Sequence, residues 1–252
     1  MSAADDIHTD RPELDAADDA RLADAIAAAT AELAAACERA GRAPDEVTIV
    51  AAAKYGGPRL CGSLVKHGIR ALGVNRVAHL NAVASRMPPH FAGEWHMIGH
   101  LQRNKVKALD VPLTALHSLD SAKLARELVK RDATPARVLV QVNVAGETQK
   151  DGVAPEAVED LLRRLRDDHG VVATGLMTMA PAVEDAEQTR PVFRALRELR
   201  DRLRDGGAEG LNELSMGMSQ DFAVAVEEGA TMVRLGRTLV AGLVGLDNDR
   251  QE

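Results

Sequence analysis

The stretch VLVQVNV, residues 138–144, indicates the fold class more strongly than any other part of the sequence. It is an almost unbroken apolar run, and such a run suits a strand of a parallel sheet that is covered by helices. Similar short runs recur on both sides of it, and stretches with helical periodicity separate them. The sequence therefore predicts an α/β protein in which strands and helices alternate.

Eight runs of this kind are strand candidates: residues 48–54, 69–73, 94–98, 115–119, 137–144, 171–177, 211–216 and 231–235. The helical stretches between them cover about residues 58–67, 75–86, 101–109, 121–132, 155–167, 184–204 and 219–228. Eight strand–helix units at this chain length favour a single closed (β/α)8 TIM barrel over an open doubly wound sheet.

An additional helix is expected before the first strand, over residues 16–42. Apolar side chains recur there at helical spacing: Leu22, Ile26, Leu33 and Cys37. We expect this helix to pack on the outside of the barrel. The expected organisation is a flexible acidic leader (1–15), one barrel domain (16–245) and a polar tail (246–252).

The composition, with 46% hydrophobic and 27% charged residues, is ordinary for a soluble globular protein. The formal net charge of -7 argues against nucleic-acid binding and gives no reason to expect attachment to an anionic membrane. The acidic N-terminus lacks the basic start and apolar run of a secretory signal, so we expect a cytoplasmic protein.

The spacing of Cys37 and Cys61 matches no metal or redox motif, which favours two free thiols.

Lys54 is the first residue that could carry chemistry, because it ends the apolar run VTIVAAAK (47–54). A lysine at the end of a barrel strand lies at the C-terminal rim, where the active sites of this fold are found. Burial there would favour the neutral amine, which can form a Schiff base with a carbonyl compound. The alternative is a strand-end lysine that extends into solvent.

The turns after the seventh and eighth strand candidates have features of a phosphate site. Ser219 could cap the next helix or donate its hydroxyl to a phosphate. Gly236 permits close backbone approach, while Arg237 and Thr238 offer amide donors. Loops in these two positions frequently form the phosphate site of a barrel. The two turns are LSMGMS (214–219) and MVRLGRT (232–238).

Arg234 and His96 are further polar candidates. Strand alternation can point Arg234 into the barrel, unless it belongs to a structural ion pair. His96 and His100 are four residues apart, but no carboxylate or cysteine cluster supports a metal site there. We expect His96 near a bound cofactor at the rim, or as a polar residue whose hydrogen bonds are satisfied.

No GxxxxGK[ST] or GxGxxG pattern is present, which argues against nucleotide binding through glycine-rich loops of those kinds.

The chain resembles the pyridoxal phosphate homeostasis proteins from about Val47 to Gly242. The motifs that carry this resemblance are VAAAK (50–54), GVNRV (73–77), EWHMIGHLQRNK (94–105), HSLD (117–120), VQVNVAGETQKDG (140–152), GLMTMAP (175–181), LSMGMSQDF (214–222) and GATMVRLGRT (229–238). The resemblance implies pyridoxal 5'-phosphate (PLP) as the cofactor. It also implies a single barrel like the cofactor domain of alanine racemase, with an added N-terminal helix.

Matched by position, the resemblance assigns roles to residues of this sequence. Lys54 would be the Schiff-base lysine, Asn75 would lie beside the cofactor, and Arg234 would face the pyridine nitrogen. The phosphate would be held by Ser219, Gly236 and Thr238. Met216 and Gly217 would help to line that pocket. The family binds the cofactor and buffers its supply, and PLP-dependent apo-enzymes are candidate recipients. A monomer is expected.

The sequence departs from the family pattern at three positions. Val74 stands where a Glu is usual, Ala53 where a Ser or Thr is usual, and His100 where a proline is usual. These departures concern details of the ring pocket, whereas Lys54 and the phosphate turns match.

The residues favour a carrier over an enzyme. A racemase needs an acid–base group on the ring face opposite the lysine, and something to exclude water. The only tyrosine, Tyr55, adjoins Lys54, and alternation would turn it away. An arginine at the pyridine nitrogen also weakens the cofactor as an electron sink. A racemase-like enzyme with an open site, and a barrel aldolase that uses Lys54 without a cofactor, are the alternatives.

Overall fold

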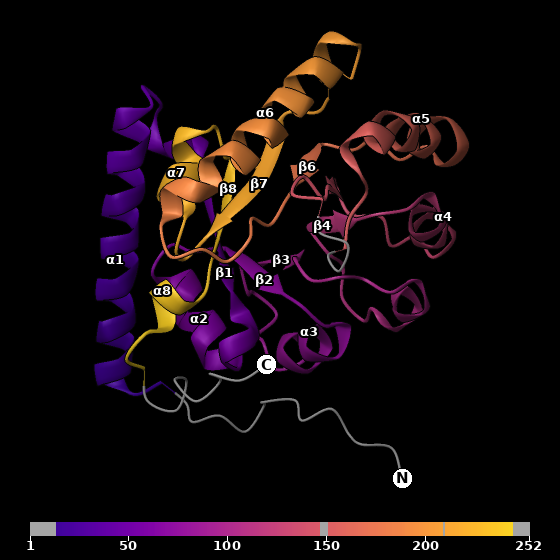
Figure 1. The fold of residues 1–252 in the computed structure, drawn as a ribbon. Coiled ribbons are helices and arrows are strands. Elements are labelled where there is room, and N and C mark those ends of the chain that lie inside the picture. Colours follow the sequence, from indigo (N-terminus) through magenta and orange to yellow (C-terminus); the bar gives the residue numbers. More distant parts are fainter. Residues whose placement is uncertain (1–13, 147–150, 209, 244–252) are drawn as a thin grey trace.

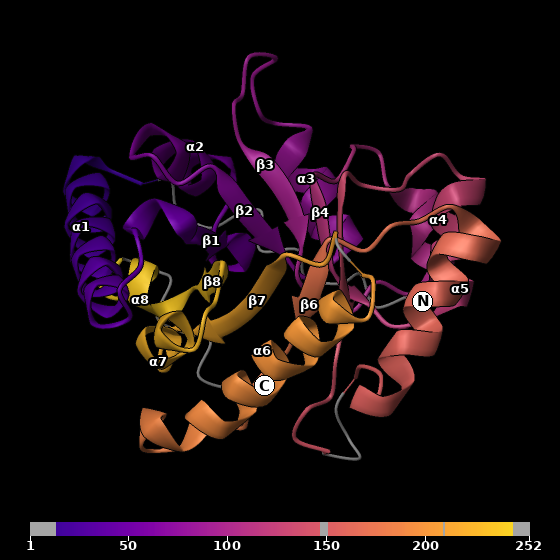
Figure 2. The ribbon, with the colours of Figure 1, turned by 90° about the horizontal axis from the view of Figure 1, so that it is seen from above.

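The strand candidates form a closed barrel of parallel strands in chain order, and β8 pairs back onto β1 (Figures 1 and 2). The computed structural model describes residues 14–146, 151–208 and 210–243. The strands are β1 (Thr48–Ala52), β2 (Ala71–Val74), β3 (Glu94–Met97), β4 (Ala115–Leu119), β5 (Arg137–Gln141), β6 (Gly175–Met177), β7 (Glu213–Met218) and β8 (Met232–Leu235). The predicted (β/α)8 TIM barrel is confirmed.

Helices surround the barrel on its outer side (Figure 1). They are α1 (Ala16–Arg39), α2 (Pro58–Lys66), α3 (Val77–Ala84), α4 (Ala122–Lys130), α5 (Val158–His169), α6 (Arg190–Asp205), α7 (Phe222–Glu227) and α8 (Arg237–Val240). Short 3-10 turns complete the connections: η1 (Pro44–Glu46), η2 (Ala53–Tyr55), η3 (Arg103–Ala108), η4 (Pro155–Ala157) and η5 (Ala186–Thr189).

The helix α1 is the predicted addition before the first strand, and it lies along the outside of the barrel beside α7 and α8 (Figures 1 and 2). The carboxylate of Asp15 caps its first turn by accepting a hydrogen bond from the backbone N–H of Asp18 at 2.8 Å. The predicted apolar face is buried: Leu22, Ile26, Leu33 and Cys37. The added N-terminal helix is therefore confirmed.

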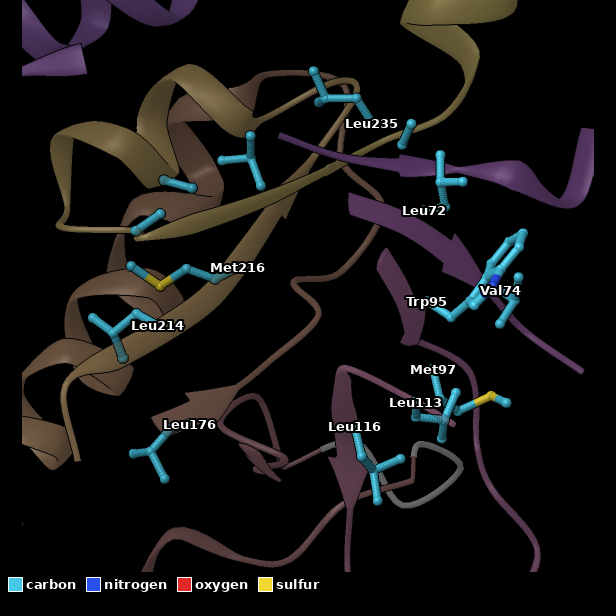
Figure 3. Close-up of a cluster of buried hydrophobic side chains, with 14 of the residues drawn as sticks. Leu72, Val74, Trp95, Met97, Leu113, Leu116, Leu176, Leu214, Met216 and Leu235 are labelled. Atoms are coloured by element: carbon cyan, nitrogen blue, oxygen red, sulfur yellow. The ribbon is translucent and has the colours of Figure 1, made fainter. Parts of the chain in front are cut away.

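Side chains along each strand alternate between the inside of the barrel and the layer under the helices. The inside holds one apolar cluster: Val50, Ala71, Leu139, Met177 and Met232. The outward side chains, such as Leu72 and Leu176, belong to the larger apolar core between barrel and helices (Figure 3). This alternation decides which side chains at the strand ends can reach the mouth of the barrel.

Several predicted boundaries differ from the structure. The predicted strand 137–144 ends at Gln141, because Val142 makes only an isolated bridge with Val153. The segment 101–109 was expected to be an α-helix and instead contains the 3-10 turn η3, in which only Val106 is buried. Within the whole predicted segment only Leu101 and Val106 are buried, which gives an α-helix too narrow an apolar face to pack against the barrel.

Parts of the predicted termini lie outside the described residues, namely 1–13 of the leader and the whole tail, 246–252. Leu14, which the leader prediction included, is buried against the core. None of the described helices combines the length and the apolar character needed to cross a membrane.

Candidate functional site

A cavity of about 490 Å³ opens at the C-terminal ends of the barrel strands. Predicted site residues that line it are Lys54, Asn75, Ser219, Arg234, Gly236 and Arg237. Further lining residues, which the sequence analysis did not select, are Ala52, Ile98, Gly99, His100, Gln141, Asp151, Met179 and Met218. A wider open groove of about 870 Å³ lies between α5 and α6 and contains none of the predicted residues.

Lys54 lies two residues beyond the end of β1, in the turn η2. Its neighbour Ala53 is fully buried, and the ring Nε2 of His79 lies 3.2 Å from the Ala53 carbonyl oxygen. This contact joins α3 to the turn that carries the lysine. The side chain of Lys54 is exposed to solvent, so the burial expected from the sequence is not observed. The side chain of Tyr55 lies outside the described part of the chain.

The loops after β7 and β8 meet at the hydroxyl of Ser219. The backbone N–H groups of Gly236 and Thr238 both donate to Ser219 Oγ, each at 3.2 Å. The hydroxyl of Thr238 donates in turn to the carbonyl oxygen of Ser219 at 3.3 Å. Two amide donors that converge on one oxygen can equally donate to a phosphate oxygen.

The packing of α7 fixes the shape of the β7 loop. Gly217 has a φ of +91°, and a Cβ added there would lie 2.5 Å from the Cβ of Ala225. The carboxylate of Asp221 accepts a hydrogen bond from the N–H of Met218 at 2.6 Å. Burial raises the pKa of Asp221, while this hydrogen bond and the charge of Arg234 act in the opposite direction.

Met216 and Gly217 do not line the cavity. Met216 is fully buried and points into the apolar layer under the helices, near Leu214 (Figure 3). The conformation of Gly217 is required by its contact with α7. In this structure the two residues support the β7 loop from behind, and no contact with the cavity is seen.

Arg234 points into the barrel, as alternation predicted. Its NH1 donates to the hydroxyl of Ser215 at 2.7 Å, and its NH2 donates to the carbonyl oxygen of Thr178 at 2.9 Å. Burial lowers the pKa of Arg234 to about 10, and the Asp221 carboxylate partly opposes this shift. The guanidinium therefore remains positively charged at neutral pH. Both of its hydrogen-bond acceptors are neutral.

His96 lies inside the barrel, but it is not among the residues that line the cavity. Its Nδ1 is 3.0 Å from Nε2 of His117, and Nδ1 of His117 is 2.8 Å from the Ser215 hydroxyl. Burial and the positive charge of Arg137 lower the pKa of His96 to about 4. Burial and the positive charges around it hold the pKa of His117 well below its ordinary value. Both rings are therefore neutral at neutral pH.

His117 and Ser215 are not among the site residues predicted from the sequence. One signal was available: each polar residue alternates with outward-facing leucines, Leu116 beside His117 and Leu214 beside Ser215. A polar residue at an inward position of an otherwise apolar strand marks an unusual barrel interior, since these interiors are mostly filled with branched apolar residues.

Asn75 and Gly99 are packed together at the rim, after β2 and β3. A Cβ added at Gly99 would lie 2.6 Å from the carbonyl oxygen of Asn75, so the close approach of the two loops requires glycine. The hydroxyl of Ser118 donates to the Gly99 carbonyl at 2.6 Å and holds this loop. At the end of β5, the Gln141 side-chain amide donates to the carbonyl oxygen of Asp151 at 3.0 Å.

The three departures from the family pattern lie in different surroundings. Val74 and Ala53 are fully buried in the outer apolar layer and do not line the cavity (Figure 3 for Val74). His100 does line the cavity, and its Nδ1 lies 3.3 Å from Oδ2 of Asp120. Of the three, only His100 adds a polar group to the site.

Within residues 14–146, 151–208 and 210–243, no group of three or more His, Cys, Asp or Glu side chains is arranged to hold a metal ion. The polar groups of the candidate site include an exposed lysine, a buried arginine and a pair of amide donors.

Comparison with known proteins identifies the family. The model of the alanine racemase N-terminal domain matches residues 23–243. A curated pyridoxal phosphate homeostasis protein from Aquifex aeolicus (strain VF5) is 42% identical over 207 residues, which cover 81% of this chain and 90% of that relative. The chain belongs to the pyridoxal phosphate homeostasis protein family. The resemblance found in the motifs is confirmed.

Solved structures agree with this family assignment. An unknown protein from Bifidobacterium adolescentis superposes with a TM-score of 0.82 at 29% identity, covering 91% of this chain and 98% of that one. PipY of Synechococcus elongatus PCC7942, solved with PLP bound, superposes with a TM-score of 0.73 at 27% identity, covering 87% of this chain and 99% of PipY. A barrel similar to this one has thus been solved with PLP bound.

Proposed function

We propose that this chain binds pyridoxal 5'-phosphate at the C-terminal mouth of its barrel and serves in the intracellular homeostasis of that cofactor. The observation that carries the proposal is the convergence of an amine, a guanidinium and the Ser219 loop on one cavity. Lys54 comes from β1, Arg234 from β8 and Ser219 from the end of β7, and all three line the same space. The names of the relatives and the PLP-bound PipY structure support this reading.

The residues present fit the chemistry of the cofactor. Pyridoxal phosphate supplies an aldehyde that condenses with a primary amine, and a cavity of about 490 Å³ is in the range of small-molecule sites. The amides of Gly236 and Thr238 already converge on the Ser219 hydroxyl, which supports a phosphate site there. Arg237, at the same rim, adds positive charge. Arg234 would donate a hydrogen bond to the pyridine nitrogen.

Lys54 would hold the cofactor through a Schiff base. Its exposure at the mouth supports an exchangeable ligand, because water and incoming amines can reach the amine from solvent. Asn75 would flank the ring, and the loop contact with Gly99 would keep it in place. His96, Met216 and Gly217 would support the site from the inner and outer layers of the barrel, without lining the cavity.

We infer that the protein carries the cofactor and does not turn over a substrate. The positive charge on Arg234 disfavours a protonated pyridine ring beside it, and such a ring is the strong electron sink of PLP enzymes. The proposed recipients of the cofactor are PLP-dependent apo-enzymes. The chain is proposed to be a cytoplasmic monomer. Its net charge of -7 disfavours nucleic-acid and membrane partners.

A racemase-like activity is the second candidate, and one observation favours it. His100 lines the cavity and its Nδ1 is paired with Asp120, an arrangement that leaves Nε2 as an acid–base group. Incubating the PLP-loaded protein with one amino-acid enantiomer in deuterated water tests this directly. The carrier proposal expects no sustained Cα exchange, whereas exchange at enzyme-like rates that His100→Asn abolishes would establish the second candidate.

An absorption titration tests the proposed binding. Adding pyridoxal phosphate to the wild-type protein should produce a saturable near-visible band from the Schiff base. Lys54→Ala should lose the band, and Lys66→Ala, which removes an exposed lysine from α2, should keep it. A band that survives Lys54→Ala would refute the lysine assignment, and the absence of any saturable binding would refute the proposed function.

A further inference from the structure

Four buried side chains form a continuous chain of hydrogen bonds across the inside of the barrel. Arg234 on β8 contacts Ser215 on β7 at 2.7 Å, and Ser215 contacts His117 on β4 at 2.8 Å. His117 contacts His96 on β3 at 3.0 Å. In the order of the closed barrel, β3 and β4 lie opposite β7 and β8, so the chain crosses the interior from one wall to the other.

The direction of the first hydrogen bond is fixed by chemistry. A guanidinium only donates, so Ser215 Oγ accepts from Arg234, and one hydroxyl proton remains to be placed. Two arrangements are then possible. Either the Ser215 hydroxyl donates to Nδ1 of His117, or Nδ1 of His117 carries its own proton and donates to Ser215.

Burial decides between the two arrangements. If Nδ1 of His117 donated, the hydroxyl proton of Ser215 would lose the His117 ring as its acceptor inside a fully buried site, which is costly. If the hydroxyl donates to Nδ1, the proton of His117 lies on Nε2 and points to Nδ1 of His96. The proton of His96 then lies on its own Nε2.

The far end of the chain favours the same direction. Nε2 of His96 is buried and has no hydrogen-bond partner among the described residues. Two charged groups lie near the ring: the carboxylate of Glu94, whose Oε2 is 3.9 Å from Nε2, and the guanidinium of Arg137, whose charge also acts on the ring. An N–H directed towards a carboxylate is attracted to it, whereas a ring lone pair would be repelled. The neutral state of both rings, favoured by burial and by nearby Arg137 and Arg234, is consistent with this arrangement.

We propose that this chain is directed from Arg234 to His96, that both histidines are neutral Nε2–H tautomers, and that Ser215 and His117 position Arg234. The hydroxyl proton of Ser215 is committed to His117, so its lone pairs face the guanidinium. Ser215 and the Thr178 carbonyl then hold two N–H groups of Arg234, a residue that also lines the cavity. The positioning role, but not the tautomer assignment, rests on the proposed binding of pyridoxal phosphate.

Nitrogen NMR of the ligand-free protein tests the tautomers directly. Long-range 15N–1H correlation spectra of 15N-histidine-labelled protein, assigned with His96→Gln and His117→Gln, should show protonated Nε2 and unprotonated Nδ1 for both rings at pH 7. His117 should keep this tautomer in His96→Gln, because the Ser215 hydroxyl selects it. A protonated Nδ1 on His117, or a doubly protonated ring on either residue, would overturn the assignment.

Ligand titration of Ser215 variants tests the positioning role. Ser215→Ala removes the acceptor of Arg234 and should weaken pyridoxal phosphate binding roughly tenfold, the effect of one hydrogen bond to a charged group. In the same variant, His117 should lose its single tautomer in the NMR spectrum. Ser215→Thr, which keeps a hydroxyl, should restore both properties.

The outcomes separate this proposal from the proposed function. Unchanged ligand affinity in a folded Ser215→Ala protein whose His117 tautomer has changed would refute the positioning role. If the wild-type protein does not bind pyridoxal phosphate, the proposed function fails, while the tautomers are still decided by the ligand-free spectra. Loss of binding in Ser215→Ala that Ser215→Thr does not restore would also overturn the role assigned to the hydroxyl.

Discussion

The hydroxyl oxygen of Ser219 accepts a hydrogen bond from the backbone N–H of Thr238 at 3.2 Å, which joins the loop after β7 to the loop after β8. The two residues are 19 positions apart in the sequence, and the pairing of parallel β7 with β8 brings them together. The proposed anion site thus consists of backbone donors whose direction is set by the barrel itself. Its specificity can be tested by changing the ligand as well as the protein.

Ser219→Ala should weaken the binding of pyridoxal phosphate about tenfold, because a hydrogen bond to a charged phosphate is lost. Binding of unphosphorylated pyridoxal should change by no more than about twofold, since that ligand lacks the phosphate that Ser219 is proposed to contact. Absorption titrations with both ligands measure the ratio. Ser85→Ala, which removes an exposed serine after α3, is the control. Equal losses for both ligands would show that Ser219 does not act on the phosphate.

The buried histidines should make the stability of the protein depend on pH. Burial, together with the charge of Arg137, lowers the pKa of His96 from 6.5 to about 4. The unfolded chain therefore binds a proton between these values while the folded chain does not, so stability falls as the pH decreases from about 6.5 towards 4. His96 alone should cost about 2 kcal/mol between pH 7 and pH 4.5. His117 acts in the same direction.

Urea unfolding at pH 7 and pH 4.5 measures this dependence. His96→Gln should reduce the loss of unfolding free energy on acidification by about 2 kcal/mol relative to wild type. His90→Gln, at an exposed position before β3, should leave the loss unchanged. The carboxylates contribute equally to all three proteins, so they cancel in the comparison. An identical pH dependence in wild type and His96→Gln would contradict the burial of a neutral ring.

Gly217→Ala should destabilise the fold by about 3 kcal/mol, through backbone strain and overpacking together. The residue has a φ of +91°, and the new methyl group would meet Ala225 at 2.5 Å and Phe222 at 3.0 Å. Gly170→Ala is the matched control, with a φ of +67° and no atom within 4 Å of the added carbon. It should cost only about 1 kcal/mol. Equal losses in urea unfolding would show that contact with α7 does not constrain the loop.

The strands of this barrel could be predicted because a parallel strand covered on both sides leaves a visible apolar run. VLVQVNV (138–144) is such a run, yet its pairing stops at Gln141. Beyond that residue the chain leaves the barrel wall, and apolar character alone does not mark where hydrogen bonding ends. The segment 101–109 has helical spacing, but it forms only the six-residue 3-10 helix η3, which packs against α4 and α3.

The cavity residues at strand ends could be predicted for a related reason. Lys54, Ser219 and Gly236 follow apolar runs in the sequence, and the carboxyl ends of all barrel strands meet at one mouth. The side chains of His117 and Ser215 could not be assigned to one another in this way. They are 98 residues apart, and their contact depends on the register and inward direction of two strands on opposite walls. The exposure of Lys54 likewise depends on the turn η2, which the sequence does not reveal.

The most direct test of the central claim is to locate the covalent attachment of pyridoxal phosphate. Borohydride reduction of the loaded protein converts a Schiff base into a stable secondary amine, and a modified lysine resists trypsin. The account predicts one labelled tryptic peptide, residues 43–59, with the modification on Lys54. Label distributed over surface lysines, or located on a lysine outside the barrel mouth, would contradict it.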